Sequence, residues 1–311
     1  MKLILAAAAM ILSLLLPPRA SAAAPIEATL TLPHDQVLPG VPFELVITYI
    51  NVSDHPLTIG GALATLVVTF RGGETTIMHK PEGHDQSDVM PAAPLRLAPG
   101  QSAQQAVSWE RGSPNWFKYT SFSGPGTYGI ALELQIVDKY IEPLGTVRTD
   151  TVTLTRIEPV GIDSELWKRM QDLSGGKWAD NWFHASSPGV TLADEIILLH
   201  PASGYYPYAL ALRALMQRKR GDIEALMEAA HRFPASPAHP YLLFAAANSA
   251  DYKALIASRA GDTDEAEKYF KLAQSNYSAA LATKSIAVRD SAEKGVRDVT
   301  RGLERLKNRD R

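Results

Sequence analysis

The hydrophobic pattern changes its period near residue 158, and this change limits the possible fold more than any other feature of the chain. Up to that point, apolar and polar residues alternate in short runs such as "IEATLTL" and "FELVITYI", which are rich in β-branched and aromatic side chains. Such alternation is typical of strands with one buried face. After Ser164, apolar residues recur every three or four positions, which is the spacing of a helix face. The sequence therefore predicts a β region followed by a helical region.

The first region, residues 24–158, is predicted to be an antiparallel β-sandwich, because turn segments such as "NVSDHP" and "LAPGQ" separate its short strands. The stretches "LPGVPFELVITYINVSDHPLTI", "LAPGQSAQQAVSW" and "FSGPGTYGIALEL" resemble a bacterial immunoglobulin-like domain. They resemble the bacterial proteinase-inhibitor-like sandwiches more loosely. The resemblance implies that the Tyr128 hydroxyl bonds to backbone at a corner of the fold. The Cys–Trp–Cys core of antibody domains is missing, so the resemblance concerns architecture alone.

The second region, residues 159–311, contains a joint that occurs twice, as "HPASGYYPYAL" and, 33 residues later, as "FPASPAHPYLL". This displacement is close to the period of tetratricopeptide repeats. "GDTDEAEKYFKLA" and, more loosely, "GDIEALMEAAHRFPAS" resemble the second helix of such a repeat. We expect the first proline of each joint to end a helix, the serine to cap the next one, and the last proline to lie in its early turns. These residues are Pro201, Ser203, Pro207, Pro234, Ser236 and Pro240. The region is therefore predicted to be a short, degenerate array of helical hairpins.

Other helix signals support this prediction. Asp222 and Asp262 are placed to cap the starts of two helices. The 40 residues from Gly221 to Gly261 exceed the repeat, which indicates an insertion within "NSADYKAL". The last helix, about residues 285–308, has an apolar stripe that either forms a coiled-coil seam or covers the end of the stack, and we expect the second. The stripe consists of Ala292, Val296, Val299, Leu303 and Leu306.

The N-terminal sequence predicts export from the cytoplasm. Lys2 precedes an apolar run from Leu3 to Leu16, and small residues follow at 20–22, as in a cleaved signal peptide over residues 1–23. The run is shorter than the roughly 20 residues of a membrane-spanning helix, although a retained anchor is the alternative. The chain has no cysteine, which excludes disulfides and thiolate metal sites, and this absence in an exported chain indicates a bacterial periplasmic or secreted protein. The net charge of -2 gives no reason to expect nucleic acid as a partner.

One polar cluster is a candidate metal site. "MHKPEGHDQSD" contains imidazoles and carboxylates, the ligands that zinc and other divalent ions accept, although a solvated loop is the simpler interpretation. The candidate ligands are His79, His84, Asp85 and Asp88. The sequence has no Gly-x-Ser-x-Gly elbow, no His-Glu-x-x-His motif and no phosphate-binding loop, so we predict no catalytic residues and no cofactor.

Aromatic residues of the helical region are candidates for partner binding, and the tryptophans among them alternatively pack at the junction between the two regions. They are Trp178, Trp182, Tyr205 and Tyr206. Because both resemblances point to folds that commonly serve in binding, the predicted function is that of a non-catalytic protein that binds or scaffolds a protein or peptide in the bacterial envelope. An envelope hydrolase or metal-binding protein that uses the 79–88 loop is one alternative, and a proteinase inhibitor is another.

Overall fold

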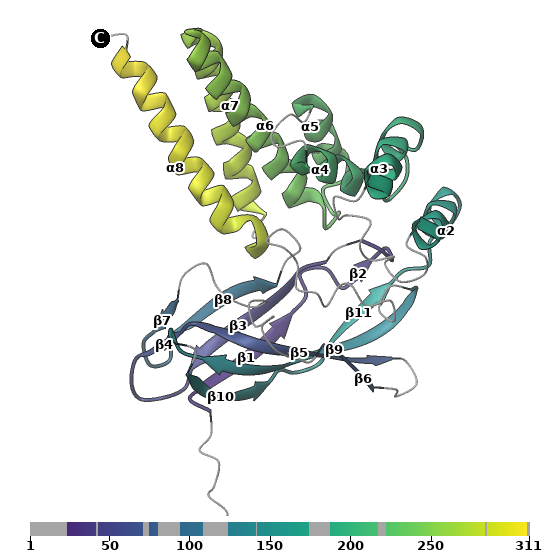
Figure 1. The fold of residues 1–311 in the computed structure, drawn as a ribbon, viewed down its shortest axis with the longest axis vertical. Helices are drawn as coiled ribbons and strands as arrows, with labels where there is room; N and C mark the ends of the chain where they lie inside the picture. The colour runs from purple at the N-terminus through teal and green to yellow at the C-terminus, as the bar shows by residue number, and fades with distance from the viewer. Residues whose placement is uncertain are drawn as a thin grey trace, which may run out of the picture.

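The computed structural model describes residues 24–41, 43–70, 75–79, 94–107, 124–140, 142–173, 187–216, 222–283 and 285–309. The predicted signal peptide, residues 1–23, lies outside this part of the chain. Within it, the last strand ends at Arg156 and the first helix begins at Ile162. Figure 1 shows the strands together in the lower part of the molecule and the helices above them. The predicted order, a β region followed by a helical region, is confirmed.

The described strands form three sheets, and all their pairings are antiparallel except that of β2 with β11. The three-stranded sheet has the order β1 (Ile26–Thr31), β3 (Leu45–Asn51), β8 (Ser102–Val107). The six-stranded sheet has the order β2 (Gln36–Val37), β11 (Val152–Arg156), β9 (Gly126–Val137), β5 (Gly61–Phe70), β6 (Thr75–His79), with β10 (Pro143–Arg148) also paired to β9. The third sheet pairs β4 (Leu57–Ile59) with β7 (Leu95–Leu97).

Strand β9 organises the six-stranded sheet because it is long enough to hold three partners. One edge of β9 pairs with the whole length of β5, from Val137 opposite Gly61 to Tyr128 opposite Phe70. The other edge pairs first with β11 and then with β10. Strand β1 alternates strictly between buried and exposed residues, as expected when one face of a strand packs on a core.

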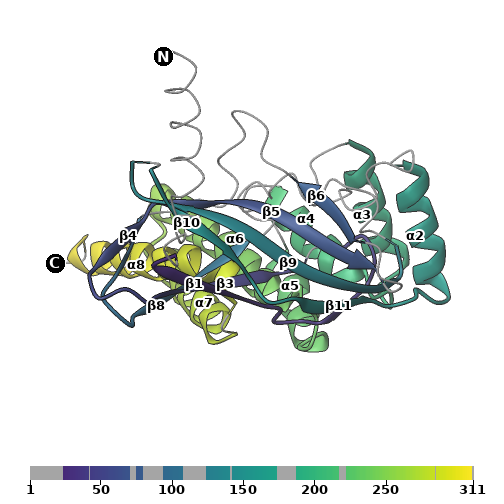
Figure 2. The same ribbon diagram turned by 90° about the horizontal axis from the view of Figure 1, so that it is seen from below.

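A single hydrophobic cluster joins the two larger sheets to the first helices. The sheets contribute buried side chains that include Ile26, Leu30, Ile47, Tyr49, Ile130, Leu132, Leu134 and Leu154. The cluster continues into α2 (Ile162–Leu173), α3 (Ser187–Leu199) and α4 (Tyr206–Met216). Viewed from the sheet side, the strands lie in front of helices α4 and α6 (Figure 2). The β region is therefore attached to the helices by shared core packing as well as by the chain.

Four further helices complete the described helical region: α5 (Ile223–Arg232), α6 (His239–Ala260), α7 (Thr263–Ala282) and α8 (Ile286–Arg309). Both predicted caps are confirmed. The Asp222 carboxylate accepts hydrogen bonds from two backbone N–H groups of α5, and the Asp262 carboxylate accepts one from Glu265 N. The segment "NSADYKAL" lies inside α6, which has 22 residues, so the extra residues of this unit belong to a longer helix.

The apolar stripe of α8 packs inside the molecule. Ala292, Val299 and Leu306 are buried, and Val296 and Leu303 are partly buried, in a second hydrophobic cluster that includes α6 and α7. Figure 1 places α8 beside α7 at the end of the row of helices. The stripe therefore serves to cover the end of the helical stack, as expected, rather than as a seam for another chain.

The two copies of the joint form the same backbone turns, shifted by 33 residues. Equivalent bonds run from Ser203 N to His200 O and from Ser236 N to Phe233 O, and from Tyr206 N to Ser203 O and from His239 N to Ser236 O. Each serine hydroxyl accepts from the backbone N–H two residues later, of Tyr205 or Ala238.

The predicted capping role of Ser236 needs correction. The N-cap of α6 is Ala238, which forms no side-chain capping bond, and Ser236 bonds within the turn before the helix. Pro240 follows in the first turn of α6 and has no N–H to be capped. The last proline of each joint does lie in the early turns of the following helix, as predicted: Pro207 in α4 and Pro240 in α6.

Among the residues that the structure describes, no helix combines the length and the apolar character needed to cross a membrane.

Candidate functional site

The loop after β2 ties the β region to the helices. Arg156, which is buried, donates from Nη1 to the carbonyls of Leu38 (2.9 Å) and Val41 (3.0 Å). The hydroxyl of Tyr205, at the start of the helical joint, donates to the carbonyl of Pro39 over 3.0 Å. Hydrogen bonds that involve a charged group are among the stronger ones in proteins. The loop is thus fixed from both sides, and the residues before and after it are held against the helices.

An open groove of about 730 Å³ lies where the turn after β1 approaches α5, α6 and α7. Its lining is mostly apolar, with three imidazoles. The apolar side chains include Met227, Pro234, Leu243, Ala279 and Ala282, and the imidazoles are His34, His231 and His239. Grooves with an apolar lining and a few polar groups are the usual shape of binding sites.

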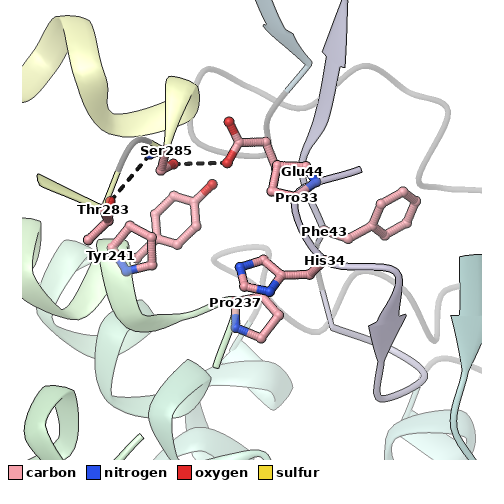
Figure 3. A pocket seen from close by; sticks show the side chains of 9 residues that line it. Pro33, His34, Phe43, Glu44, Pro237, Tyr241, Thr283 and Ser285 are labelled. Atoms are coloured by element: carbon pink, nitrogen blue, oxygen red, sulfur yellow. Dashed lines mark hydrogen bonds between the residues drawn. The ribbon is translucent and has the colours of Figure 1, made fainter. Parts of the chain in front are cut away.

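A smaller cavity of about 140 Å³ adjoins this groove, since His34, Pro240 and Thr283 line both. We call it the junction cavity; its remaining lining residues are Pro33, Phe43, Glu44, Pro237, Tyr241 and Ser285. Figure 3 shows the Tyr241 hydroxyl directed towards the space between Ser285 and Glu44, with the His34 ring on the opposite wall. The β region and the helical region each supply part of the wall.

A hydrogen bond crosses the junction cavity between residues 241 positions apart in the chain: Ser285 Oγ donates to Glu44 Oε2 over 2.9 Å. Both side chains are buried, at 7% and 8% exposure. The Ser285 N–H donates to Thr283 Oγ1 (3.3 Å), and the Thr283 hydroxyl donates to the carbonyl of Ala280 (2.6 Å). The carboxylate that precedes β3 is therefore linked to the turn between α7 and α8.

The imidazole of His34 is kept in its neutral form. Its burial lowers its pKa, and the nearby Asp35 carboxylate opposes this effect only in part. His239 Nδ1 lies 3.0 Å from the carbonyl oxygen of Ala230. When Nδ1 carries the proton and donates to that carbonyl, Nε2 is an acceptor. Both rings lie in the lining of the groove and add hydrogen-bonding groups to it.

These groups suit non-covalent binding: the groove offers apolar surface, and the junction cavity offers a carboxylate and hydroxyls. Within the described ranges, no group of three or more His, Cys, Asp or Glu side chains is placed to hold a metal ion.

The structure reaches few of the residues predicted from the sequence as metal ligands or aromatic contacts. His79 is the last residue of β6, opposite Leu66 in the pairing with β5. The other candidate metal ligands and the two tryptophans lie outside the described residues: His84, Asp85, Asp88, Trp178 and Trp182. Their roles in metal or partner binding stay predictions.

The two predicted tyrosines differ in exposure. Tyr205 is fully buried, and its hydroxyl is used inside the molecule, so this conformation leaves no surface of its side chain for a partner. Burial also raises its pKa, so the hydroxyl stays protonated as the donor to Pro39. Tyr206 is partly exposed and packs 6.1 Å, between ring centroids, from Phe233. Neither belongs to the described lining of the groove or the junction cavity.

Sequence reasoning missed Glu44, Ser285 and the three histidines of the groove, because they come from separate segments with no common spacing. The one local signal is Glu44 itself, a charged residue within the apolar run "PFELVITYI". A carboxylate beside a buried strand usually has a specific partner.

No protein-family model matches the sequence, and no curated protein sequence matches it. Among solved structures, it is similar to the sporulation control protein Spo0M from Bacillus subtilis, with 13% identity, a TM-score of 0.27, and coverage of 48% of this chain and 55% of that one. The chain is also similar to a structural genomics target, SoR45, with 12% identity, a TM-score of 0.22, and coverage of 42% and 84% respectively. A third similarity is to the alkylpurine DNA glycosylase AlkC from Pseudomonas fluorescens, with 13% identity, a TM-score of 0.20, and coverage of 42% and 31%. Similarities this weak assign no function.

Proposed function

We propose that the chain is a non-catalytic protein of the bacterial envelope, periplasmic or secreted, that binds an extended peptide segment of a protein partner. The observation that carries this proposal is the open, mostly apolar groove formed by α5, α6, α7 and the turn after β1. An extended peptide suits such a groove because its side chains reach apolar walls while its backbone remains accessible to water and to the imidazoles.

The proposal includes two finer assignments of fold. An immunoglobulin-like sandwich is supported by the Tyr128 hydroxyl, which donates to the carbonyl of Gly124 over 2.6 Å, as the resemblance implies. A degenerate tetratricopeptide-like array is supported by the matching hydrogen bonds of the two joints. Folds of both kinds often serve in binding, although a fold alone does not determine function. The proposed export rests on the signal-like residues 1–23.

A peptide library displayed on phage and selected against the purified protein tests the proposal. Ala282 is exposed on the wall of the groove, so Ala282→Trp fills the groove without entering the core. Selected peptides are expected to bind the wild-type protein and to lose at least about tenfold in affinity for this variant, which corresponds to roughly 1.4 kcal/mol.

Ser278→Trp is the matched control, because Ser278 is also exposed on α7 but does not line the groove. This variant is expected to bind selected peptides as the wild type does. The proposal fails if selection yields no binding peptide, or if peptides bind Ala282→Trp as tightly as the wild type.

A further inference from the structure

The described lining of the groove contains three imidazoles and no other ionisable side chain. His34 comes from the turn after β1, His231 from α5 and His239 from α6. Aspartate, glutamate, lysine and arginine are absent from this part of the lining. An imidazole is the side chain whose charge ordinarily changes between about pH 5 and 8. The charge that the described wall presents to a ligand therefore depends on how many of these rings hold a second proton.

The ring of His239 is held so that its charge decides its hydrogen-bonding role. The carbonyl of Ala230, in the last turn of α5, has no N–H to accept from four residues later, because that residue is Pro234. His239 Nδ1 lies 3.0 Å from this carbonyl oxygen and supplies the donor instead. Nδ1 therefore carries the proton of the neutral ring, and Nε2 is an acceptor. Protonation keeps the bond to Ala230 and makes Nε2 a donor, which suits an anionic ligand.

His231 lies where a positive charge is favoured. It is exposed in the last turn of α5, and the carbonyl end of a helix carries partial negative charge. The charged neighbours on α5 are Glu228, one turn earlier, and Arg232, the next residue, and both are exposed. Because their charges are opposite, they add no net charge to this end of the groove.

His34 closes the groove from the β region, and Figure 3 shows its ring near Pro237, on the side of the helices. Asp35 follows it in the chain, and Glu44 and Tyr241 lie in the wall of the adjoining junction cavity. Burial outweighs the effect of Asp35 and lowers the pKa of His34, so an anionic ligand beside the ring is needed to favour its charged form near neutral pH.

The wall from α7 adds Ala279, Ala282 and Thr283, which carry no charge. Lys284 follows in the chain and lies outside the described residues, so the experiment below separates its charge from that of the imidazoles.

We propose that the groove anchors the carboxylate of an aspartate or glutamate side chain in the bound peptide, and that peptide affinity rises as the pH falls from about 8 towards 5. This inference rests on the proposed function, because the apolar walls of the groove hold the rest of the peptide. A lysine or arginine side chain of the peptide meets no anionic partner in the described lining, and its charge opposes that of a protonated ring.

The sign of the pH dependence follows from these charges. A carboxylate beside an imidazole favours the protonated ring, so the complex binds more protons than the separate protein and peptide. Binding that takes up protons becomes tighter as the pH falls. The peptide carboxylate itself stays ionised over this range, because aspartate and glutamate side chains have ordinary pKa values of about 4. A peptide N–H that donates to Nε2 of His239 gives the opposite sign, since protonation removes that acceptor.

Matched peptides from the library selection test the inference. The selected peptides are expected to share an acidic residue, and a peptide with a single one is compared with its version in which glutamine or asparagine replaces that residue. Both are acetylated at the N-terminus and amidated at the C-terminus, so the side chain is the only carboxylate. Affinities are measured at pH 6.0 and 7.5, with circular dichroism to check folding. We expect the acidic peptide to bind about threefold or more tightly at pH 6.0 than at pH 7.5, and its amide version to change by less than about twofold.

Protein variants identify the source of the charge. His231→Gln is expected to reduce the gain in affinity at low pH, and His231→Gln combined with His239→Gln to bring it below about twofold. His55→Gln is the matched control, because His55 is exposed on the turn between β3 and β4 and does not line the groove, and it should behave as the wild type. If Lys284→Gln removes the preference for the acidic peptide while the histidine variants keep it, the imidazole assignment is wrong.

The peptide comparison decides the question even if the double variant unfolds. If the acidic peptide and its amide version bind the wild type equally at pH 6.0, or if affinity decreases as the pH falls, the inference is wrong while the proposed function stands. If the amide version gains the same pH dependence once its C-terminus is left unmodified, the groove takes a chain terminus and the side-chain assignment is wrong.

A second arm needs no library peptide. The imidazole resonances of His34, His231 and His239 are followed by NMR as the pH is varied, with N-acetyl-glutamate methylamide or its glutamine analogue present. The inference requires the glutamate compound to move these titrations to higher pH and the glutamine compound to leave them in place, with His55 as the internal control. Failure of peptide selection together with such shifts contradicts the proposed function alone, and the absence of shifts overturns the inference.

Discussion

The side chain of Asn51 holds the turn between β3 and β4 with four hydrogen bonds. Its amide nitrogen donates to the carbonyls of His55 (2.8 Å) and Leu97 (3.0 Å), and its oxygen accepts from the N–H and the hydroxyl of Ser53. The side chain is fully buried.

Asn51→Ala leaves these groups without their partner, so we expect a loss of about 3 kcal/mol in the free energy of unfolding, measured with urea. Gln104→Ala, an exposed change on β8, is expected to alter stability by less than about 0.5 kcal/mol. An equally small change for Asn51→Ala contradicts this account.

His34 gives the protein a pH dependence of predictable sign. Burial lowers its pKa in the folded state below the ordinary value of 6.5, so the unfolded chain binds more protons between these two values. The contribution of neutral His34 to the free energy of unfolding is fully present above pH 6.5. It is lost progressively as the pH falls towards the pKa of the folded state. When the free energy of unfolding is measured with urea at several pH values from 7.5 down to 5, it is expected to decrease less for His34→Gln than for the wild type. Equal pH dependence of the two proteins rules out this role.

At the scale of elements, two glycines allow α8 to lie close to α7. A Cβ on Gly302 would lie 2.7 Å from Cζ of Phe270, and one on Gly295 would collide with the ring of Tyr277. Alanine favours an isolated helix over glycine by about 1 kcal/mol, but forcing extra volume into a packed interface costs about 1–3 kcal/mol. Gly302→Ala is therefore expected to lower the melting temperature despite its better helix propensity. Ser275→Ala, at an exposed site on α7, should leave it unchanged, and an unchanged or raised value for Gly302→Ala refutes the packing argument.

Elements were predictable from the sequence where their determinants are local. The caps at Asp222 and Asp262 depend on the next two or three residues, and the repeated joint forms all its bonds within a few positions. The capping role of Ser236 was wrong for an equally local reason, because Pro240 removes a donor from the first turn. The close approach of α8 to α7 was not predictable, since a glycine in a helix gives no sign of which ring will face it.

At the scale of the whole molecule, the sequence predicted two regions but not how they meet. The contacts that build the junction cavity join Glu44 to Ser285, and those at the loop after β2 join Pro39 to Tyr205, far apart in the chain. No spacing rule relates such positions, because a strand pattern and a helix pattern each specify only which face is buried. Tyr205 illustrates this: its pattern marked an aromatic residue free to face a partner, whereas the fold uses it to hold the β region.

Because the β region and the first helices share one hydrophobic cluster, they are expected to unfold together. Tyr205→Phe tests this coupling, since it removes only the hydroxyl that donates to the Pro39 carbonyl. We expect the variant to lose about 1–2 kcal/mol in its free energy of unfolding. Helix ellipticity and a probe of the β region, such as amide exchange in β9, are expected to report the same new denaturation midpoint. Tyr140→Phe is the matched control, because Tyr140 is 71% exposed at the β9–β10 turn, and it should leave both midpoints in place. If Tyr205→Phe shifts the helix signal while β9 keeps the wild-type midpoint, the two regions are separate folding units and the shared core does not couple them.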